Sequence, residues 1–135
     1  AQNNTATILQ QAITPSSTSS KVLVNVSANL GGDNNAYGYG QVFRDSTVIG
    51  AGAAASSRPQ VSFSLMSALS ANFDYRMAIH NFMFLDSPST TSSTTYAVKV
   101  TCTSGNIRLN RTTQDGNDTL GVRSMSTLTL TEIAG

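Results

Sequence analysis

The sequence predicts an all-β domain, either a sandwich or a barrel, from three observations. Short runs of alternating apolar and polar residues recur along the chain, with turn residues roughly every 8–12 positions. No segment shows the sustained i, i+3, i+4, i+7 apolar spacing of an amphipathic helix. The clearest strand is Val22–Leu30, where the even-numbered residues are apolar and Asn25, Ser27 and Asn29 alternate with them. Because this strand buries one face, a second sheet is required to cover it.

Length and composition indicate that residues 1–135 form a single domain. A chain of 135 residues is long enough to bury a sizeable core. Charged residues make up only 11%, less than half the usual share, and hydroxyl and amide side chains replace them, as is common in extracellular and virion proteins. The eight Lys and Arg residues are scattered singly, which argues against a nucleic-acid partner. No long apolar run is present, so no membrane insertion is expected.

The first half of the chain supplies most of the predicted strands. Residues 1–12 are predicted to be an edge strand or a connector, and a Pro and Ser/Thr turn leads from them into Val22–Leu30. In Tyr37–Arg44, glycines alternate with large residues, so one face is bare and another backbone or side chain is expected to approach it closely. Further short strands are expected at residues 48–53 and 61–65.

The segment from Phe73 to Phe84 contains a change of phase. Phe73, Tyr75, Met77 and Ile79 share one face of an extended chain, whereas Phe82 and Phe84 have the opposite parity. A β-bulge near His80–Asn81, or a strand that passes from one sheet to the other, would explain this change. Residues 86–95 are of low complexity and are expected to form an exposed loop.

The last third is predicted to begin with a hairpin. Residues 96–103 and 107–111 flank the connection Ser104-Gly105-Asn106, and a polar loop at 112–118 then leads to a closing strand at 125–133. The first and last strands are expected to pair near one another. Cys102 is the only cysteine and is in phase with Val98 and Val100, so it is expected to be a buried thiol that packs as a small apolar group.

Three segments resemble recurring segments of tailed-bacteriophage proteins, chiefly tail fibres and virion appendages of marine phages. They are Ala12–Val24, Tyr37–Gly50 and Ser126–Ile133, and the resemblance covers nearly the whole chain. It implies an antiparallel jelly-roll β-sandwich like those of tumour-necrosis-factor-type domains, which usually form homotrimers. It also implies a place on the surface of the phage particle, in contact with other virion proteins. The shared segments are strand and turn signatures without catalytic content.

The aromatic residues give indirect support for a trimer. Six of them exceed what one thin sandwich must bury, namely Tyr37, Tyr39, Phe43, Tyr75, Phe82 and Phe84. The bare glycine face of residues 37–44 would also suit tight packing about a symmetry axis. The alternative is that these aromatics fill the core of the single chain.

The sequence predicts neither an enzyme nor a cofactor site. His80 is the only histidine, and the chain contains no Gly-x-Ser-x-Gly nucleophile motif, so a structural histidine is expected. A glycosidase-type depolymerase needs two facing carboxylates, and the seven carboxylates here are never neighbours on one strand. Residues 115–118 place oxygen ligands at short spacing but lack the distal glutamate of a calcium loop, so a polar turn is expected instead of a metal site.

Loops at one end of a sandwich are the usual recognition surface, and three polar loops are candidates: residues 33–35, 86–95 and 112–118. Their amides, carboxylates and hydroxyls suit hydrogen bonding to a host-surface glycan, with Tyr37 as a stacking face. The candidate receptor contacts are Asp33, Asn34, Asn35, Tyr37, Asp115, Asn117 and Asp118. The simpler alternative is that these residues only form solvated turns.

The predicted function is therefore that of a non-enzymatic virion structural protein, a trimeric tail-fibre or appendage domain that contacts the host surface. One alternative is a capsid decoration or head-fibre protein that binds the capsid shell. Another is a secreted carbohydrate-binding module, and a third is a polysaccharide depolymerase.

Overall fold

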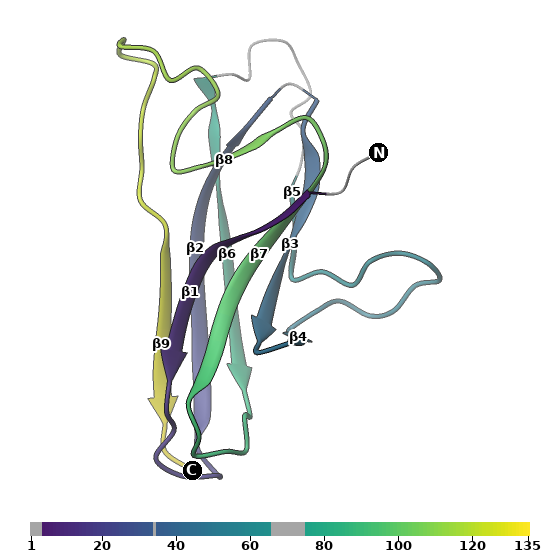
Figure 1. The fold of residues 1–135 in the computed structure, drawn as a ribbon, viewed down its shortest axis with the longest axis vertical. Helices are drawn as coiled ribbons and strands as arrows, with labels where there is room; N and C mark the ends of the chain where they lie inside the picture. The colour runs from purple at the N-terminus through teal and green to yellow at the C-terminus, as the bar shows by residue number, and fades with distance from the viewer. Residues whose placement is uncertain (1–3, 34, 66–74) are drawn as a thin grey trace.

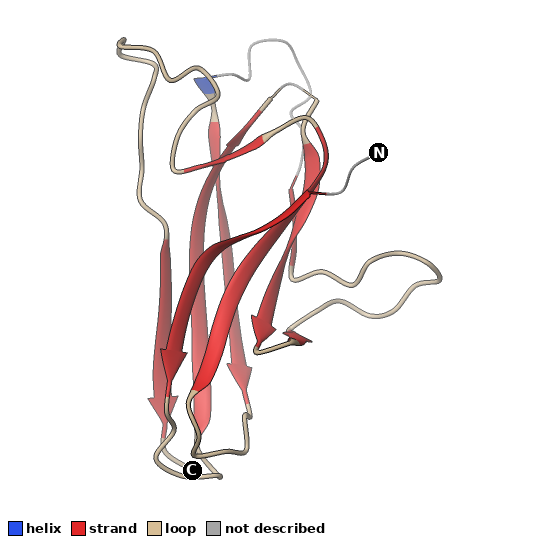
Figure 2. Ribbon diagram, viewed as in Figure 1, coloured by secondary structure: helices blue, strands red, loops and turns tan. Residues whose placement is uncertain are grey.

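Two antiparallel sheets pack face to face in the computed structural model, which describes residues 4–33, 35–65 and 75–135 (Figures 1 and 2). Sheet A has the order β1 (Asn4–Ile13), β7 (Thr94–Ser104) and β3 (Tyr37–Arg44), and two short strands, β4 (Thr47–Ile49) and β5 (Phe63–Leu65), pair with β3. Sheet B is centred on β2 (Lys21–Gly32), which pairs with β6 (Met77–Asp86), β8 (Ile107–Leu109) and β9 (Thr127–Ile133).

The chain passes repeatedly from one sheet to the other. It leaves sheet A after β1, returns for β3 to β5, enters sheet B for β6, returns for β7 and ends in sheet B with β8 and β9. Such alternation is typical of jelly-roll sandwiches. The predicted all-β antiparallel sandwich is therefore confirmed, and the start of the described chain forms an edge strand, β1. The trimeric assembly stays a prediction.

The core lies between the inner faces of the two sheets. The even-numbered residues of β2, from Val22 to Leu30, are buried, as their alternation predicts. They face Val42 of β3 and the inner residues of β7, including Val98 and Val100. At about 25 cal/mol per Å² of apolar surface, burial of each such side chain contributes roughly 1.5–3 kcal/mol. Period-2 patterning of β2 and β7 is thus what brings the two sheets together.

The predicted β-bulge or change of sheet near His80–Asn81 is wrong. β6 pairs with β2 without a bulge, from Val22 opposite Asp86 to Gly31 opposite Met77. His80, Phe82 and Phe84 lie on the partly buried inner face, whereas Ile79 and other apolar residues of odd number are exposed on the outer face. The strand is therefore apolar on both faces, which mimics a phase change in the sequence. Phe73, which the same prediction included, lies outside the described residues.

The predicted hairpin at Ser104-Gly105-Asn106 is also wrong. β7 pairs with β1 and β3 in sheet A, whereas β8 pairs with β2 in sheet B, so this turn connects the two sheets. In the same way, the first and last strands do not pair with each other. β1 pairs with β7, and β9 pairs with β2, although β1 and β9 lie close together across the gap between the sheets.

The bare glycine face of β3 is filled by the chain itself. A Cβ atom at Gly40 would overlap the ring of Phe63 from β5, and one at Gly38 would meet the side chain of Ile107. Close approach by another group is thus confirmed for these glycines. Packing of this face about a symmetry axis is not, because Phe63 and Ile107 of the same chain already occupy it.

A buried carboxylate links the two sheets at the end opposite the β2–β3 connection. Asp86, the last residue of β6, is 5% exposed, which corrects the prediction of an exposed loop at its position. The hydroxyl of Tyr96 donates to its Oδ2 atom at 2.7 Å, and Nη1 of Arg44 donates to Oδ1 and Oδ2 at 2.8 and 2.9 Å. Burial, together with this hydrogen bond to Asp86, raises the pKa of Tyr96, so its hydroxyl stays a proton donor.

Replacement of Tyr96 by Phe tests this link. The variant leaves the carboxylate of Asp86 buried with one hydrogen-bond donor fewer. Because a hydrogen bond to a charged group contributes about 1.5–3 kcal/mol, the free energy of unfolding should fall by about 1.5–3 kcal/mol. Urea denaturation of the wild type and the variant measures the difference. The matched control is Tyr37→Phe, at a ring that is 56% exposed, which should change stability by no more than about 0.5 kcal/mol. Equal stability of wild type and Tyr96→Phe would contradict the assigned role.

Candidate functional site

Two of the three predicted recognition loops meet at one end of the sandwich. Asp33 directly follows β2 and accepts hydrogen bonds from Nδ2 of Asn106 at 2.6 Å and from Oγ1 of Thr113 at 3.3 Å. Its Oδ1 atom also lies 3.8 Å from Nη2 of Arg108, and its backbone N–H donates to the carbonyl of Asn106 at 3.1 Å. Asp33 therefore ties the β2–β3 connection to the β7–β8 turn and to the segment that follows β8.

The carboxylates of the 110–126 segment are used in the same internal way. Asp115 accepts from Nε and Nη2 of Arg123 at 3.1 and 2.7 Å and lies 3.6 Å from Nη1 of Arg111. Because Arg111 and Arg123 face each other in an isolated β-bridge, the carboxylate of Asp115 reduces the repulsion between their two like charges. Oδ1 of Asp118 accepts the backbone N–H groups of Leu120 and Gly121, as in a polar turn.

The candidate receptor contacts thus divide into two groups. Asp33, Asp115 and Asp118 accept hydrogen bonds that hold the loops in shape, although Asp115 and Asp118 are also exposed. Asn35, Tyr37 and Asn117 are exposed. Asn34 lies outside the described residues. Loop 86–95, the third candidate, lies at the opposite end of the sandwich, because Asp86 pairs with the first residues of β2 and Asp33 follows the last (Figure 1). The prediction that all three loops share one end is therefore wrong.

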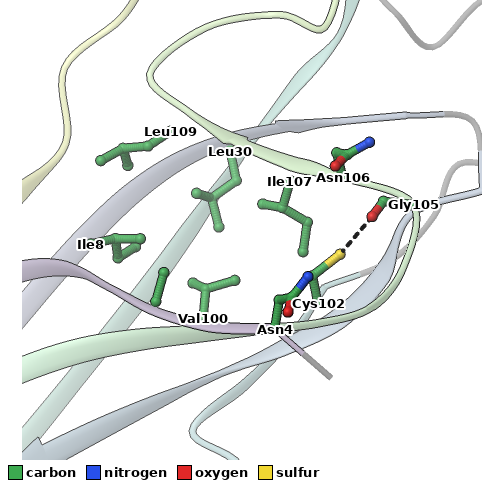
Figure 3. Close-up of a pocket in the computed structure, with 10 residues that line it drawn as sticks. Asn4, Ile8, Leu30, Val100, Cys102, Gly105, Asn106, Ile107 and Leu109 are labelled. Carbon is green, nitrogen blue, oxygen red and sulfur yellow. Dashed lines mark hydrogen bonds between the residues drawn. The ribbon is translucent and has the colours of Figure 1, made fainter. Parts of the chain in front are cut away.

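A cavity of about 220 Å³ opens between the sheets at the loop end (Figure 3). Its wall is aliphatic and comes from both sheets, with Ala6, Ile8, Val100, Leu30, Ile107 and Leu109 as contributors. Asn4, Gly105 and Asn106 add polar groups. Cys102 was expected to be buried but is only partly so, and its Sγ lies within hydrogen-bonding distance of the carbonyls of Ser104 and Gly105, at 3.1 and 3.3 Å. The sequence pattern gave no signal for this cavity.

An apolar strip runs along the outer face of β6. It consists of Ile79, Met83 and Leu85, which are 61%, 65% and 49% exposed. Leu23 of β2 lies opposite Leu85 and extends the strip towards the middle of sheet B. Among the strands that the structure describes, β6 pairs with β2 alone and so lies at the edge of sheet B, and residues 77–86 contain no Lys, Arg or Pro that would protect an edge strand from association.

Hydrogen bonds of Ser and Lys side chains close the end of the sandwich that carries loop 86–95. The backbone N–H and the hydroxyl of Ser16, in the β1–β2 connection, donate to Oε1 of Glu132 at 2.7 and 2.6 Å. Nζ of Lys21 donates to the hydroxyl of Ser87 at 2.7 Å. Hydrogen bonding by the Ser16 side chain lowers the pKa of Glu132. Hydrogen bonds from the Ser/Thr-rich turns, which include the Ser16–Glu132 clasp, therefore hold this end of the sandwich closed.

His80 packs as an aromatic side chain. Its ring stacks on Phe63 of β5 with 5.6 Å between the centroids, and burial lowers its pKa. Within residues 4–33, 35–65 and 75–135, no group of three or more His, Cys, Asp or Glu side chains is placed to hold a metal ion. The same residues include no helix of the length and apolarity needed to cross a membrane.

Comparison with known protein families and with characterised protein sequences finds no match to this chain.

The Ser16–Glu132 clasp makes a prediction about acid. The pKa of Glu132 is lower in the folded chain than its ordinary value of 4.5. Its stabilising contribution is therefore complete above pH 4.5 and is lost as the pH falls through the folded pKa. Hydrogen exchange at the amide of Ser16 should accelerate over this range, relative to amides in the middle of β2.

Glu132→Gln is the control for this titration, because its amide cannot ionise. In that variant the relative exchange rate of the Ser16 amide should not vary with pH over the same range. If the ratio of exchange rates between the Ser16 amide and the β2 amides were also independent of pH in the wild type, the Ser16–Glu132 hydrogen bond would not depend on the charge of Glu132.

Proposed function

We propose that this chain is a non-enzymatic structural protein of a phage virion, a tail-fibre or appendage domain that assembles as a homotrimer and contacts the host surface. The observation that carries the proposal is the apolar strip on β6. Exposed Ile79, Met83 and Leu85 share the outer face of one strand, where Asn81 separates Ile79 from Met83, and the chain has few charged residues elsewhere to offset their effect on solubility. Covering this strip with further copies of the chain removes it from water.

The composition of the strip favours a second copy over a nucleic acid or a charged partner. Its outward-facing neighbours on β2, Asn25 and Ser27, are uncharged, and so are Thr127 and Thr129 on β9. A face with an apolar column beside amide and hydroxyl side chains resembles the apolar centre and polar rim of a protein–protein interface. Rotational symmetry repeats the same contact at every interface of a closed ring of copies.

The segments that resemble phage appendage proteins support the location on a virion. They supply Ser16, Arg44 and Glu132, the residues that hold the closed end of the sandwich together. The proposed mechanism is multivalent contact: weak sites that are held rigidly on one particle bind together far more tightly than each alone. Asn35, Tyr37 and Asn117 are the exposed polar and aromatic side chains offered to a glycan at the loop end.

Placement on the capsid shell is the alternative within the same class. It is distinguished by where the protein is found: a capsid decoration protein remains with tail-less capsids, and an appendage domain remains with isolated tails. A secreted carbohydrate-binding module would instead be monomeric and would bind glycan in isolation.

Met83→Glu tests the role of the strip. The wild-type chain should have the mass of three chains in light scattering after size exclusion, and the variant should have the mass of one, because burial of a carboxylate in an apolar interface is costly. Met83 is 65% exposed in the single chain, so its replacement should not disturb the fold. Thermal unfolding of the monomeric Met83→Glu variant should therefore remain cooperative.

Thr129→Glu is the matched control, because Met83 and Thr129 both pair with Asn25, on opposite sides of β2. This variant adds the same charge outside the apolar strip and should remain trimeric. A monomeric wild type would exclude the trimer for this domain, and a trimeric Met83→Glu variant would exclude the strip as its interface.

A further inference from the structure

The cavity at the loop end has the features of a preformed binding site. It is a half-open cleft at the end of the sandwich, with an aliphatic wall from β1 and β7 of sheet A and from β2 and β8 of sheet B. Figure 3 shows Ile8, Leu30, Val100 and Ile107 converging on the same space, with Cys102 and Asn106 nearer its edge. Leu30 and Val100 are each only 5% exposed, so the apolar surface left uncovered here belongs mainly to Ala6, Ile8, Ile107 and Leu109.

The turn that borders the cavity is held in place from several sides. Gly105 adopts a φ of +66°, and its carbonyl lies 3.3 Å from Sγ of Cys102. Asn106, the next residue, is bonded to Asp33 through both its side chain and its backbone carbonyl. Because these bonds fix the β7–β8 turn, closing the cavity would require breaking them. An open cavity is thus built into the fold.

The lining selects the chemistry of a ligand. Among the described residues that line the cavity there is no carboxylate, amine or guanidinium group, so a neutral ligand is favoured. The wall includes six aliphatic side chains, and an enclosed apolar cavity of about 150 Å³ binds benzene, so the aliphatic part of this half-open wall favours a ligand of the same kind. At about 220 Å³, this cavity has room for a two-ring molecule.

We propose that this cavity is a binding site for a small, neutral, largely apolar ring compound of the size of benzene to indole. The edges of the ring face Leu30, Val100 and Ile107, and any single polar group points towards the amide of Asn106 or the carbonyl of Gly105. The site lies at the β1–β8 side of the sandwich, away from the β6 strip, so it does not depend on the proposed trimer.

Titration of the intact chain with indole tests the proposal. The methyl resonances of Leu30, Val100, Ile107 and Leu109 should shift in a saturable way, whereas those of Val22 and Val24, at the other end of β2, should not. Ala6→Phe places a ring in the cavity and should abolish the shifts. Ala12→Phe makes the same change at an exposed position of β1 outside the cavity and should preserve them.

Protection of Cys102 gives a second measurement that needs no variant. Since Cys102 is the only cysteine, alkylation by a neutral maleimide reports on this cavity alone. By mass action, indole at ten times its dissociation constant should slow the reaction about tenfold. Absence of methyl shifts up to the solubility limit of indole would overturn the proposal. So would shifts that persist unchanged in Ala6→Phe, or an alkylation rate that indole does not alter.

Discussion

The carboxylate of Asp86 constrains how the two sheets meet. A buried carboxylate is stable only when donors surround it, and here the donors are Tyr96 and Arg44. Asp86 ends β6 in sheet B, whereas both donors belong to sheet A, so the charge is neutralised only when the sheets are correctly aligned. The Ser/Thr turns then close the same end through Ser16 and Glu132. The loop end has no comparable buried link between the sheets among the described residues, and there the sandwich opens into a cavity.

The contrast between β2 and β6 shows how far patterning predicts this fold. In β2 the buried valines alternate with Asn25, Ser27 and Asn29, so the polar residues mark the outer face and the strand is predictable from sequence. In β6 both faces are apolar, and the same method invents a bulge. The charged residue of β6, Asp86, lies on the inner face, and it is buried there because its partners Arg44 and Tyr96 lie on other strands. Its position in the sequence therefore does not show which face is buried. An apolar outer face is a property of the surface, and period-2 patterning cannot distinguish it from a core.

The candidate site illustrates a different limit. Loop residues such as Asp33 and Asp115 are recognisable from local composition, because short polar side chains favour turns. What they bind is decided by Arg108 and Arg123, whose positions depend on β8 crossing to sheet B. Since the sequence suggested a hairpin for that region, these ion pairs could not be predicted. The cavity could not be predicted for the same reason, because its wall combines β1 and β2 from the start of the chain with β7 and β8 from its last third.

The apolar strip and the cavity, the two apolar surfaces that the core leaves uncovered, lie at separate places on the sandwich. The apolar strip is on the β6 side of β2, and the cavity is on the side where β8 pairs with β2, next to β1 and β7. Because β2 stands between them, copies of the chain that pack on the strip leave the mouth of the cavity open. The proposed assembly and the proposed ligand binding would therefore use separate surfaces of one sandwich. Each uses apolar surface that the core leaves uncovered, on the outer face of sheet B in one case and at the open end between the sheets in the other.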